Sequence, residues 1–276
     1  LLNLRMLKDR IKSLAQAYKQ EVIANRRHLH SHPELSFKEY ETAAFVAEKL
    51  KEIGITEIES KATTGWSALI RGKNPEKKVV ALRADMDALP IIEANEAPYK
   101  SQNPGVMHAC GHDAHTASLL GAAKILNEVR DQFEGTIKLI FQPGEEKLPG
   151  GASLLIKEGI LDNPKVDLII GQHVMPFLNT GNVGFRKGLY MASTDEIYIT
   201  IHGKGGHGAM PHLCIDPVAA AAQVIVSLQQ IVSRKAKPIL PTVLSFGKIN
   251  SNGGATNVIP NSVSFEGTLR TLDEEW

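Results

Sequence analysis

Apolar and polar residues follow a helical period first and a strand-like one afterwards. Apolar positions three and four residues apart predict helices over about 7–30 and 37–53. Continuous apolar runs then predict three strands, which begin near Val79, Gly135 and Val166. An alanine- and leucine-rich segment, 116–129, predicts a helix between the first two strands. Strands that alternate with helices are typical of an α/β domain.

The pattern changes at about residue 191. Strict alternation in EIYITIHG predicts a strand with one buried face, followed by a glycine-rich loop, a helix over 217–233 and two more strands. This β-α-β-β order is the first part of a ferredoxin-like unit, whose second helix would begin at DEEW. We therefore expect a metal-binding catalytic domain over 1–190 and a ferredoxin-like α+β domain over 191–276, both incomplete at their carboxyl ends.

The composition gives little reason to expect a charged partner. The chain has 276 residues, 43% hydrophobic, and its 31 basic and 30 acidic side chains leave a net charge of +1. We therefore expect neither nucleic acid nor a membrane as a partner. The two cysteines, Cys110 and Cys214, form no framework of paired spacings, which favours a reducing, cytoplasmic setting. The first residue is leucine, so the question of an upstream targeting segment stays open.

Acidic residues or histidine follow each predicted strand of the first domain. Asp85 and Asp87 follow the first strand, Glu145 and Glu146 the second, and His173 the third. In open α/β sheets, ligands bind outside the carboxyl ends of the strands. We therefore expect these side chains to converge on one crevice.

The segment MHACGHDAH concentrates groups that bind metal ions. Cys110 and His112 flank a glycine just before a predicted helix, and thiolate and imidazole are good ligands for zinc and similar divalent ions. A purely structural zinc site would normally offer four such ligands in paired spacings. The remaining ligands must therefore come from elsewhere, and Glu146 and His173 are candidates because they follow the converging strands.

The doublet in QPGEE suits a division of roles between two carboxylates. One can bind metal while its neighbour accepts a proton from a metal-activated water. An isolated Glu-Glu pair is usually solvated surface, so this interpretation depends on the convergence of the strands. Asp87 is expected to orient a ligand histidine through a hydrogen bond. His108 and His115 are expected to support the site or start the helix, rather than to bind metal.

Seven motifs, in order, resemble those of the metal-dependent N-acyl-amino-acid amidohydrolases. This family includes hippurate hydrolase, bacterial carboxypeptidases of the aminoacylase type and plant auxin-conjugate hydrolases. The motifs, between about residues 26 and 270, are RRHLHSHPELSFKEYET, RADMDALPI, HACGHDAHTA, FQPGEE, GQHVMP, GKGGHGAMPH and TNVIPNSVSFEGTLRT. The resemblance implies a mixed-sheet, zinc-peptidase-like catalytic domain with an inserted ferredoxin-like domain that serves as lid and dimerisation surface.

The resemblance also implies an activity: hydrolysis of the amide bond of N-acyl or N-aroyl amino acids, which releases a carboxylic acid and an amino acid. Glu145 matches the general base. The metal ligands would be Cys110, which can bridge two ions, His112, Glu146 and His173. They would hold one or two divalent ions per subunit, zinc first, with manganese, nickel or cobalt as alternatives. Asp85 stands where more distant relatives carry a ligand histidine, and its role stays open.

Three residues of the second domain match further functional positions. His207 resembles a histidine that reaches the active site of the partner subunit and polarises the scissile carbonyl, which implies a homodimer formed through this domain. Asn257 and Arg270 resemble substrate contacts, and a guanidinium suits a free carboxylate. As alternatives, Asn257 could cap a turn and Arg270 could pair with an acid of its own sheet.

Two other functions stay open at this stage. Cys110 could be a nucleophile activated by a nearby histidine, or the chain could be a non-catalytic dimerisation or binding module. In the family, the last metal-binding histidine lies in a segment that follows the inserted domain. We therefore expect residues 1–276 alone to be inactive. The preferred acyl group, the preferred amino acid and the native metal do not follow from the residues.

Overall fold

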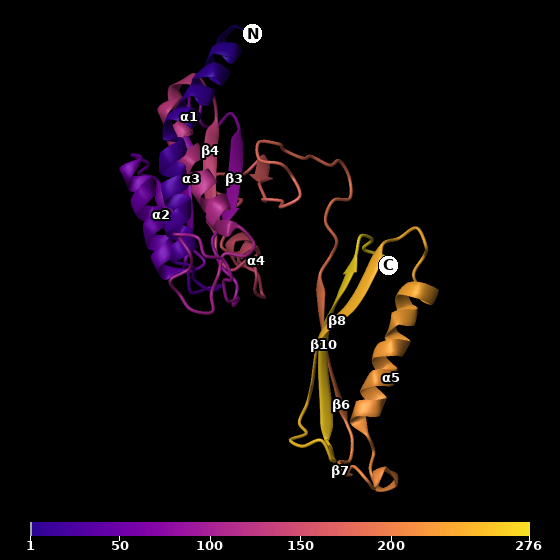
Figure 1. Cartoon of the computed structure of the whole chain (residues 1–276). Helices are drawn as coiled ribbons and strands as arrows, with labels where there is room; N and C mark the ends of the chain where they lie inside the picture. The colour runs from indigo at the N-terminus through magenta and orange to yellow at the C-terminus, as the bar shows by residue number, and fades with distance from the viewer. Residues whose placement is uncertain (1) are drawn as a thin grey trace. The chain divides into compact units, whose positions relative to one another are not determined.

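The structure, a computed structural model, describes residues 2–276, and the chain divides into two compact units between Phe177 and Leu178 (Figure 1). Each unit has a hydrophobic core of its own. The predicted domain boundary at residue 190 stays a prediction. Among the described residues, no helix is both long enough and apolar enough to cross a bilayer.

The first unit contains a mixed five-stranded sheet in the order β1-β2-β4-β3-β5. The strands are β1 Ile58–Lys61, β2 Gly65–Arg71, β3 Val79–Asp85, β4 Thr136–Gln142 and β5 Leu168–Gly171. β3 runs parallel to both β4 and β5. β2 pairs antiparallel with β4 on one side and with β1 on the other. The predicted α/β class with a mixed sheet is confirmed. The parallel pairing also brings the carboxyl ends of β3, β4 and β5 to one edge.

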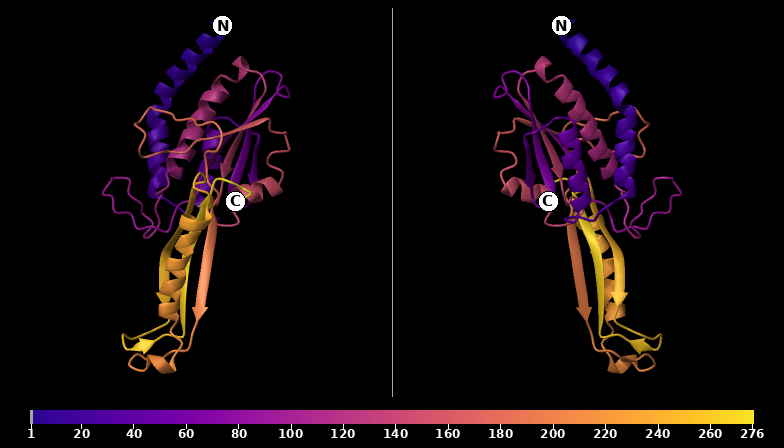
Figure 2. Two further views of the ribbon diagram at one scale, coloured as in Figure 1. Left: turned by 90° about the vertical axis from the view of Figure 1, so that its right-hand side faces the viewer. Right: turned by 90° about the vertical axis from the view of Figure 1, so that its left-hand side faces the viewer.

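Helices cover both faces of this sheet. They are α1 Leu2–Ser31, α2 Tyr40–Glu52, α3 His112–Glu128 and α4 Gly151–Lys157, with a short 3-10 turn, η1, at Arg130–Gln132. α1 packs along α3, and Figure 2 shows the two helices side by side. On β4, Leu139 and Phe141 face the core shared with α2 and α3, while Ile140 faces the smaller core shared with α4. Alternation along this one strand therefore buries both faces of the sheet.

The observed elements of the first unit differ from the expected ones. The sequence pattern did not predict β1, β2 or α4, and α3 begins at His112 rather than at residue 116. β2 forms a hairpin with β1, but its other edge pairs with β4, a strand that is distant in sequence, so its stability depends on tertiary packing. The early start of α3 follows from Gly111, whose φ of 89° reverses the chain just before a buried histidine.

The second unit is a β-α-β-β arrangement with a small additional strand pair. Its elements are β6 Asp195–His202, β7 Gly206–His207, η2 Pro211–Leu213, α5 Pro217–Gln230, the π-helical turn η3 Ile231–Lys235, β8 Thr242–Ser251, β9 Val258–Ile259 and β10 Ser262–Thr271. The main sheet has the antiparallel order β6-β10-β8, and β7 pairs with β9. α5 packs on one face of the main sheet around Ala221, Val263 and Phe265.

Aspartate side chains accept backbone amides at the start of α5 and near the last residues of the chain. Asp216 caps α5, accepting the amide of Val218 at 2.8 Å. Residues 272–276 have no helical hydrogen-bond pattern, although Asp273 accepts the amide of Trp276 at 2.7 Å, as an N-cap residue does. The expected second helix at DEEW, and with it a complete ferredoxin-like unit, stays a prediction.

Replacing Leu50 with alanine should lower the free energy of unfolding of the first unit by about 2–5 kcal/mol. Leu50 is 0% exposed and belongs to the larger core, so the substitution leaves a cavity. Urea denaturation followed by the fluorescence of Trp66, with Trp276 replaced by phenylalanine in every variant, would measure the loss. Ile92, which is 82% exposed, provides the control, and Ile92→Ala should change stability by less than about 0.5 kcal/mol.

Candidate metal centre

The loops after β3, β4 and β5 meet the first residue of α3 at one edge of the sheet. The ligand atoms of Cys110, His112 and His173 lie within 4.8 Å of one another, and so do those of His112, Glu145 and Glu146. Cys110 Sγ is 3.3 Å from His173 Nε2. The structure thus brings together the four predicted metal ligands and the predicted general base, and their individual roles stay predictions.

The clearest sign of a missing partner is His112. Its Nδ1 lies 2.8 Å from the carbonyl oxygen of Asp87 and 3.2 Å from the Asp87 carboxylate. Its Nε2 is buried, makes no hydrogen bond in the structure, and is 3.8 Å from Glu146 Oε1. A buried polar nitrogen without a partner is costly, and a cation beside a carboxylate would satisfy it. The residues present therefore fit a metal ion.

His173 presents the same nitrogen to the site. Its Nδ1 donates to the carbonyl oxygen of Val174 at 2.7 Å, which leaves Nε2 free to face the Cys110 thiol. In both histidines a hydrogen bond to a backbone carbonyl therefore orients the ring and determines the tautomer.

Asp85 and His115 form a supporting network next to the ligands. His115 Nδ1 is 2.6 Å from one Asp85 oxygen, and Arg83 donates to the other at 2.6 Å. His115 Nε2 accepts the amide of Val174 at 2.9 Å, which holds the residue after His173. Asp85, His112 and His115 also lie close enough together to hold an ion. Because these bonds use both oxygens of Asp85 and both nitrogens of His115, the pair is better suited to support.

His108 has no role in this ligand cluster. The ring is buried, and neither nitrogen has a hydrogen-bond partner in the structure. Burial lowers the pKa of His108 to about 4, so the imidazole is neutral near pH 7. Among the described residues, His108 belongs to no group that is close enough to hold an ion.

The charges of the site shift several pKa values. Burial acts to lower the pKa of His112, but the hydrogen bond to Asp87, the nearby Cys110 thiol and the charges of Asp85 and Asp87 outweigh it and raise this pKa to about 11. Burial opposes ionisation of Asp85, yet the hydrogen bond from His115 and the charge of Arg83 lower its pKa. Partial burial and the charge of Glu146 raise the pKa of Glu145. Without a cation, the site thus holds His112 protonated among carboxylates.

Gly111 allows the loop and helix to approach closely. Its φ is +89°, and a Cβ atom there would lie 2.3 Å from Cγ2 of Val174. Val174 is the residue whose amide His115 holds. The glycine therefore permits the contact between the start of α3 and the loop that carries His173.

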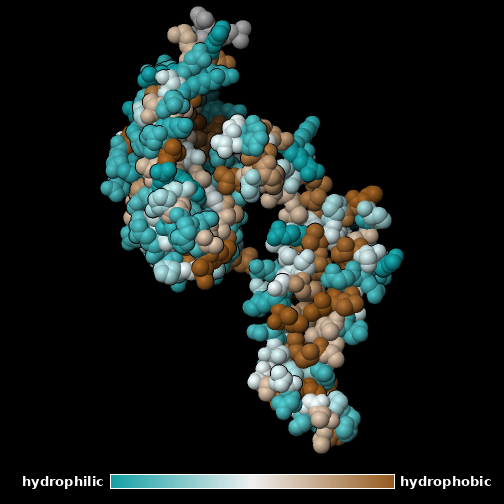
Figure 3. Space-filling view, in the orientation of Figure 1, coloured by the Kyte–Doolittle hydropathy of each residue, from teal (hydrophilic) through white to brown (hydrophobic). Residues whose placement is uncertain are grey.

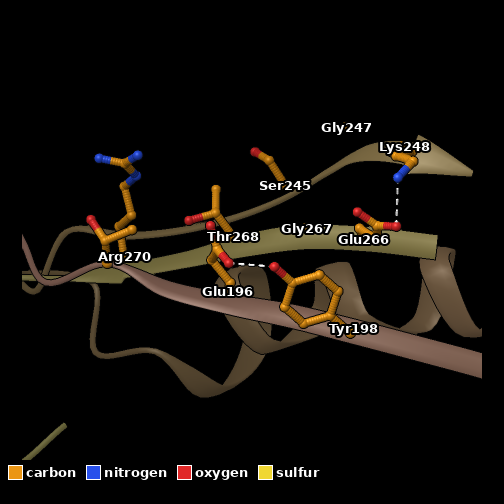
Figure 4. Close-up of a pocket in the computed structure, with 10 residues that line it drawn as sticks. Glu196, Tyr198, Ser245, Gly247, Lys248, Glu266, Gly267, Thr268 and Arg270 are labelled. Atoms are coloured by element: carbon orange, nitrogen blue, oxygen red, sulfur yellow. Dashed lines mark hydrogen bonds and ion pairs between the residues drawn. The ribbon is translucent and has the colours of Figure 1, made fainter. Parts of the chain in front are cut away.

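The predicted residues of the second unit fall into two groups. His207 on β7 pairs with Val258, and the amide of Gly208 donates to the carbonyl oxygen of Asn257 at 2.7 Å, so His207 and Asn257 lie together. Arg270 lies near the far end of β10, eight positions after Ser262, the first residue of that strand. Along an extended strand, eight positions separate Arg270 from Ser262 by roughly 26 Å. It lies on the sheet surface drawn in Figure 4 and has no ion-pair partner among the described residues.

Two side chains at the site escaped the sequence analysis. Ser36 donates to the Asp87 carboxylate at 2.6 Å, and the amide of Gly144 donates to Glu39 at 2.7 Å. Both belong to the motif RRHLHSHPELSFKEYET, but no spacing rule links that motif to loops 51 and 105 residues away. Only its presence among the ordered motifs could have marked it as functional.

Comparison with known proteins agrees with this chemistry. Residues 81–263 match the family described as peptidase family M20/M25/M40. The chain is 50% identical over 269 residues to an N-acyl-L-amino acid amidohydrolase of Geobacillus stearothermophilus, covering 98% of this chain and 72% of that protein. It is 49% identical over 257 residues to an N-acetyl-L-cysteine deacetylase of Bacillus subtilis, covering 93% of this chain and 60% of that protein.

A solved structure extends the similarity to the fold. The Bacillus subtilis YXEP protein, described as a dinuclear metal binding peptidase from the M20 family, aligns with a TM-score of 0.73 and 40% identity. The alignment covers 94% of this chain and 66% of that one. With the ligand cluster described above, this similarity supports a divalent metal at the site.

Metal uptake should strengthen as pH rises. His112 has a pKa of about 11 without metal, so it must release a proton before its Nε2 can bind an ion, and affinity should increase at least about tenfold per pH unit. Competition with a chromophoric chelator at pH 6, 7 and 8 would measure this slope. His112→Ala should bind more weakly and lose about one proton from the slope, while the exposed His212→Asn should match the wild type. A slope unchanged in His112→Ala would contradict the assignment.

Proposed function

The chain belongs to peptidase family M20/M25/M40, and we propose that it provides the metal site of a hydrolase that cleaves the amide bond of N-acyl amino acids. The observation that carries this proposal is the buried, unpartnered Nε2 of His112 beside the doublet Glu145-Glu146. The products would be a carboxylic acid and an amino acid. The amidohydrolase and deacetylase named above support the substrate class.

We assign the metal to Cys110, His112, Glu146 and His173. The mixture of thiolate, imidazole and carboxylate suits zinc, with manganese, nickel or cobalt as alternatives that metal analysis would distinguish. When bound, a divalent ion supplies Lewis acidity to a water molecule and to the scissile carbonyl. The 3.3 Å approach of Cys110 Sγ to His173 Nε2 supports a common ligand cluster. The same contact is also the feature that favours the alternative of a Cys110 nucleophile.

Glu145 would act as the general base. Its raised pKa makes the carboxylate a stronger proton acceptor than an ordinary glutamate. It would take a proton from the attacking water and deliver it to the amide nitrogen that leaves. Glu146, whose oxygen is 3.8 Å from His112 Nε2, would stay a ligand.

The second unit would complete the site in a homodimer. An N-acyl amino acid is on the order of 10 Å long, whereas Arg270 and the pair His207–Asn257 lie near opposite ends of one long sheet. One substrate molecule therefore cannot contact both groups of the same copy. We propose that Arg270 binds the substrate carboxylate, and that His207 and Asn257 of a second copy contact the scissile amide.

Exposed apolar residues support association through the second unit. Val218 and Val226 of α5 are 46% and 66% exposed, and Figure 3 shows apolar side chains gathered on this unit. β6 and β8 are also the edges of its main sheet among the described strands.

The cysteines support a proposal about location. Cys110 and Cys214 are both free thiols, which supports a reducing, cytoplasmic setting.

Glu145→Gln should retain metal but lose hydrolysis by at least about 100-fold in the whole protein, because an amide cannot accept the proton of water. Glu146→Gln should instead lower metal affinity. Metal content by mass spectrometry and turnover of a panel of N-acyl amino acids would separate the two effects. Loss of metal in the first variant with retention in the second would reverse the roles. Activity abolished by thiol alkylation but resistant to chelators would favour the Cys110 nucleophile.

A mixture of two inactive variants should regain activity if His207 acts across a dimer. Equal amounts of Glu145→Gln and His207→Ala, unfolded together and refolded, should recover about a quarter of wild-type activity, because half of the dimers are hybrids with one intact site. Sedimentation would establish the dimer, and each variant refolded alone is the control. No recovery in a mixture shown to contain hybrids would mean that His207 does not act in trans.

A further inference from the structure

The loop before α2 makes direct contact with the turn that carries the glutamate doublet. Glu39 is 0% exposed, and its Oε1 accepts the amides of Phe37 at 2.9 Å and of Gly144 at 2.7 Å. Its Oε2 accepts the Thr64 hydroxyl at 2.7 Å. A single buried side chain therefore joins the start of α2, the turn after β1 and the turn after β4.

The contact with Gly144 is closely packed as well as hydrogen-bonded. Gly144 has a φ of +53°, and a Cβ atom there would lie 2.3 Å from the Phe37 ring. Phe37 itself has a φ of 64°, a conformation that a bulky residue rarely adopts. Because Glu39 accepts the Phe37 amide, the same carboxyl group stabilises both unusual backbone conformations.

Glu145 lies between two anchored backbone groups. On its amino-terminal side, Gly144 is held by Glu39 through its amide and by Gly151 through its carbonyl oxygen at 2.8 Å. On its carboxyl-terminal side, the amide of Glu146 donates to the Asp87 carboxylate at 3.0 Å. Asp87 also contacts His112, so one anchor is tied to the metal centre. The other anchor, Glu39, makes no hydrogen bond to a proposed ligand side chain among the described residues.

We propose that Glu39 is a positioning residue for the general base. By fixing Gly144, it determines where the carboxylate of Glu145 lies relative to the water from which it takes a proton. This inference rests on the proposed function, since Glu145 must be the base for its position to matter. A displacement of about 1 Å in a catalytic group can cost up to about 100-fold in rate, so the backbone anchor should affect turnover more than substrate binding.

Two substitutions separate the length of the Glu39 side chain from its charge. In Glu39→Gln, the amide oxygen can still accept both backbone amides, and the amide nitrogen can donate to Thr64 Oγ1. In Glu39→Asp, the charge remains, but the shorter side chain cannot reach Gly144 and Phe37 together. If Glu39 acts through position, glutamine should replace it and aspartate should not.

The test is steady-state kinetics on the whole metal-loaded protein with an N-acyl amino acid. Glu39→Ala and Glu39→Asp should lower kcat by on the order of 10- to 100-fold with KM and metal content within about twofold of wild type, whereas Glu39→Gln should retain kcat within about threefold. Thr64→Val is the matched control, because it removes the Oε2 bond without touching Gly144. It should lower the melting temperature while leaving kcat unchanged.

The outcomes separate this inference from the proposed function. If Glu145→Gln is inactive but Glu39→Ala and Glu39→Asp keep full kcat, the positioning role is wrong and the general base stands. If Glu39→Asp is active and Glu39→Gln is not, Glu39 acts through its charge, and the inference fails. Loss of metal from Glu39→Gln and Glu39→Ala alike would also overturn it. Should Glu39→Ala not fold, the contrast between aspartate and glutamine decides the question alone.

Discussion

One buried carboxylate, that of Asp87, joins the parts of the first unit that make up the metal centre. It lies 3.2 Å from the His112 ring and accepts the hydroxyl of Ser36 and the amide of Glu146. These partners come from the start of α3, the loop before α2 and the turn after β4. A buried acceptor must be satisfied from every side, so the positions of these three segments depend on one another. Burial opposes ionisation of Asp87, but these hydrogen bonds lower its pKa.

The site as a whole is arranged around buried and half-buried carboxylates. Four carboxylates lie near His112, and although burial opposes the charge, the hydrogen bond to Asp87 and the charges of Asp85 and Asp87 raise the pKa of that histidine to about 11. Such a concentration of negative charge is expensive inside a protein unless a cation neutralises it. Bonds to backbone carbonyls meanwhile aim the Nε2 atoms of His112 and His173 into the same space. The electrostatics and the geometry therefore agree on a divalent ion.

In the second unit, the constraint is the length of the main sheet, which determines how far apart the proposed substrate contacts lie. Its long antiparallel strands separate Arg270 from His207 and Asn257 within one copy of the chain. The rigidity comes from a continuous ladder between β6, β10 and β8, so bending the sheet until both groups met would break backbone hydrogen bonds. The proposed shared active site in a homodimer would use both groups without such a distortion.

The sequence by itself determined the fold class and predicted which side chains gather at the ends of the parallel strands. Apolar runs that end in Asp85, Glu145 and His173 implied parallel strands with a shared edge, since the alternation of strands and helices leaves few other topologies. The tertiary structure alone decided what those residues contact. The hairpin of β1 and β2 joins the sheet through the pairing of β2 with the distant strand β4, and the contacts of Ser36 and Glu39 are with loops 51 and 105 residues away. Spacing along a chain reports only local periodicity, whereas a buried hydrogen bond is determined by how the packed chain brings distant segments together.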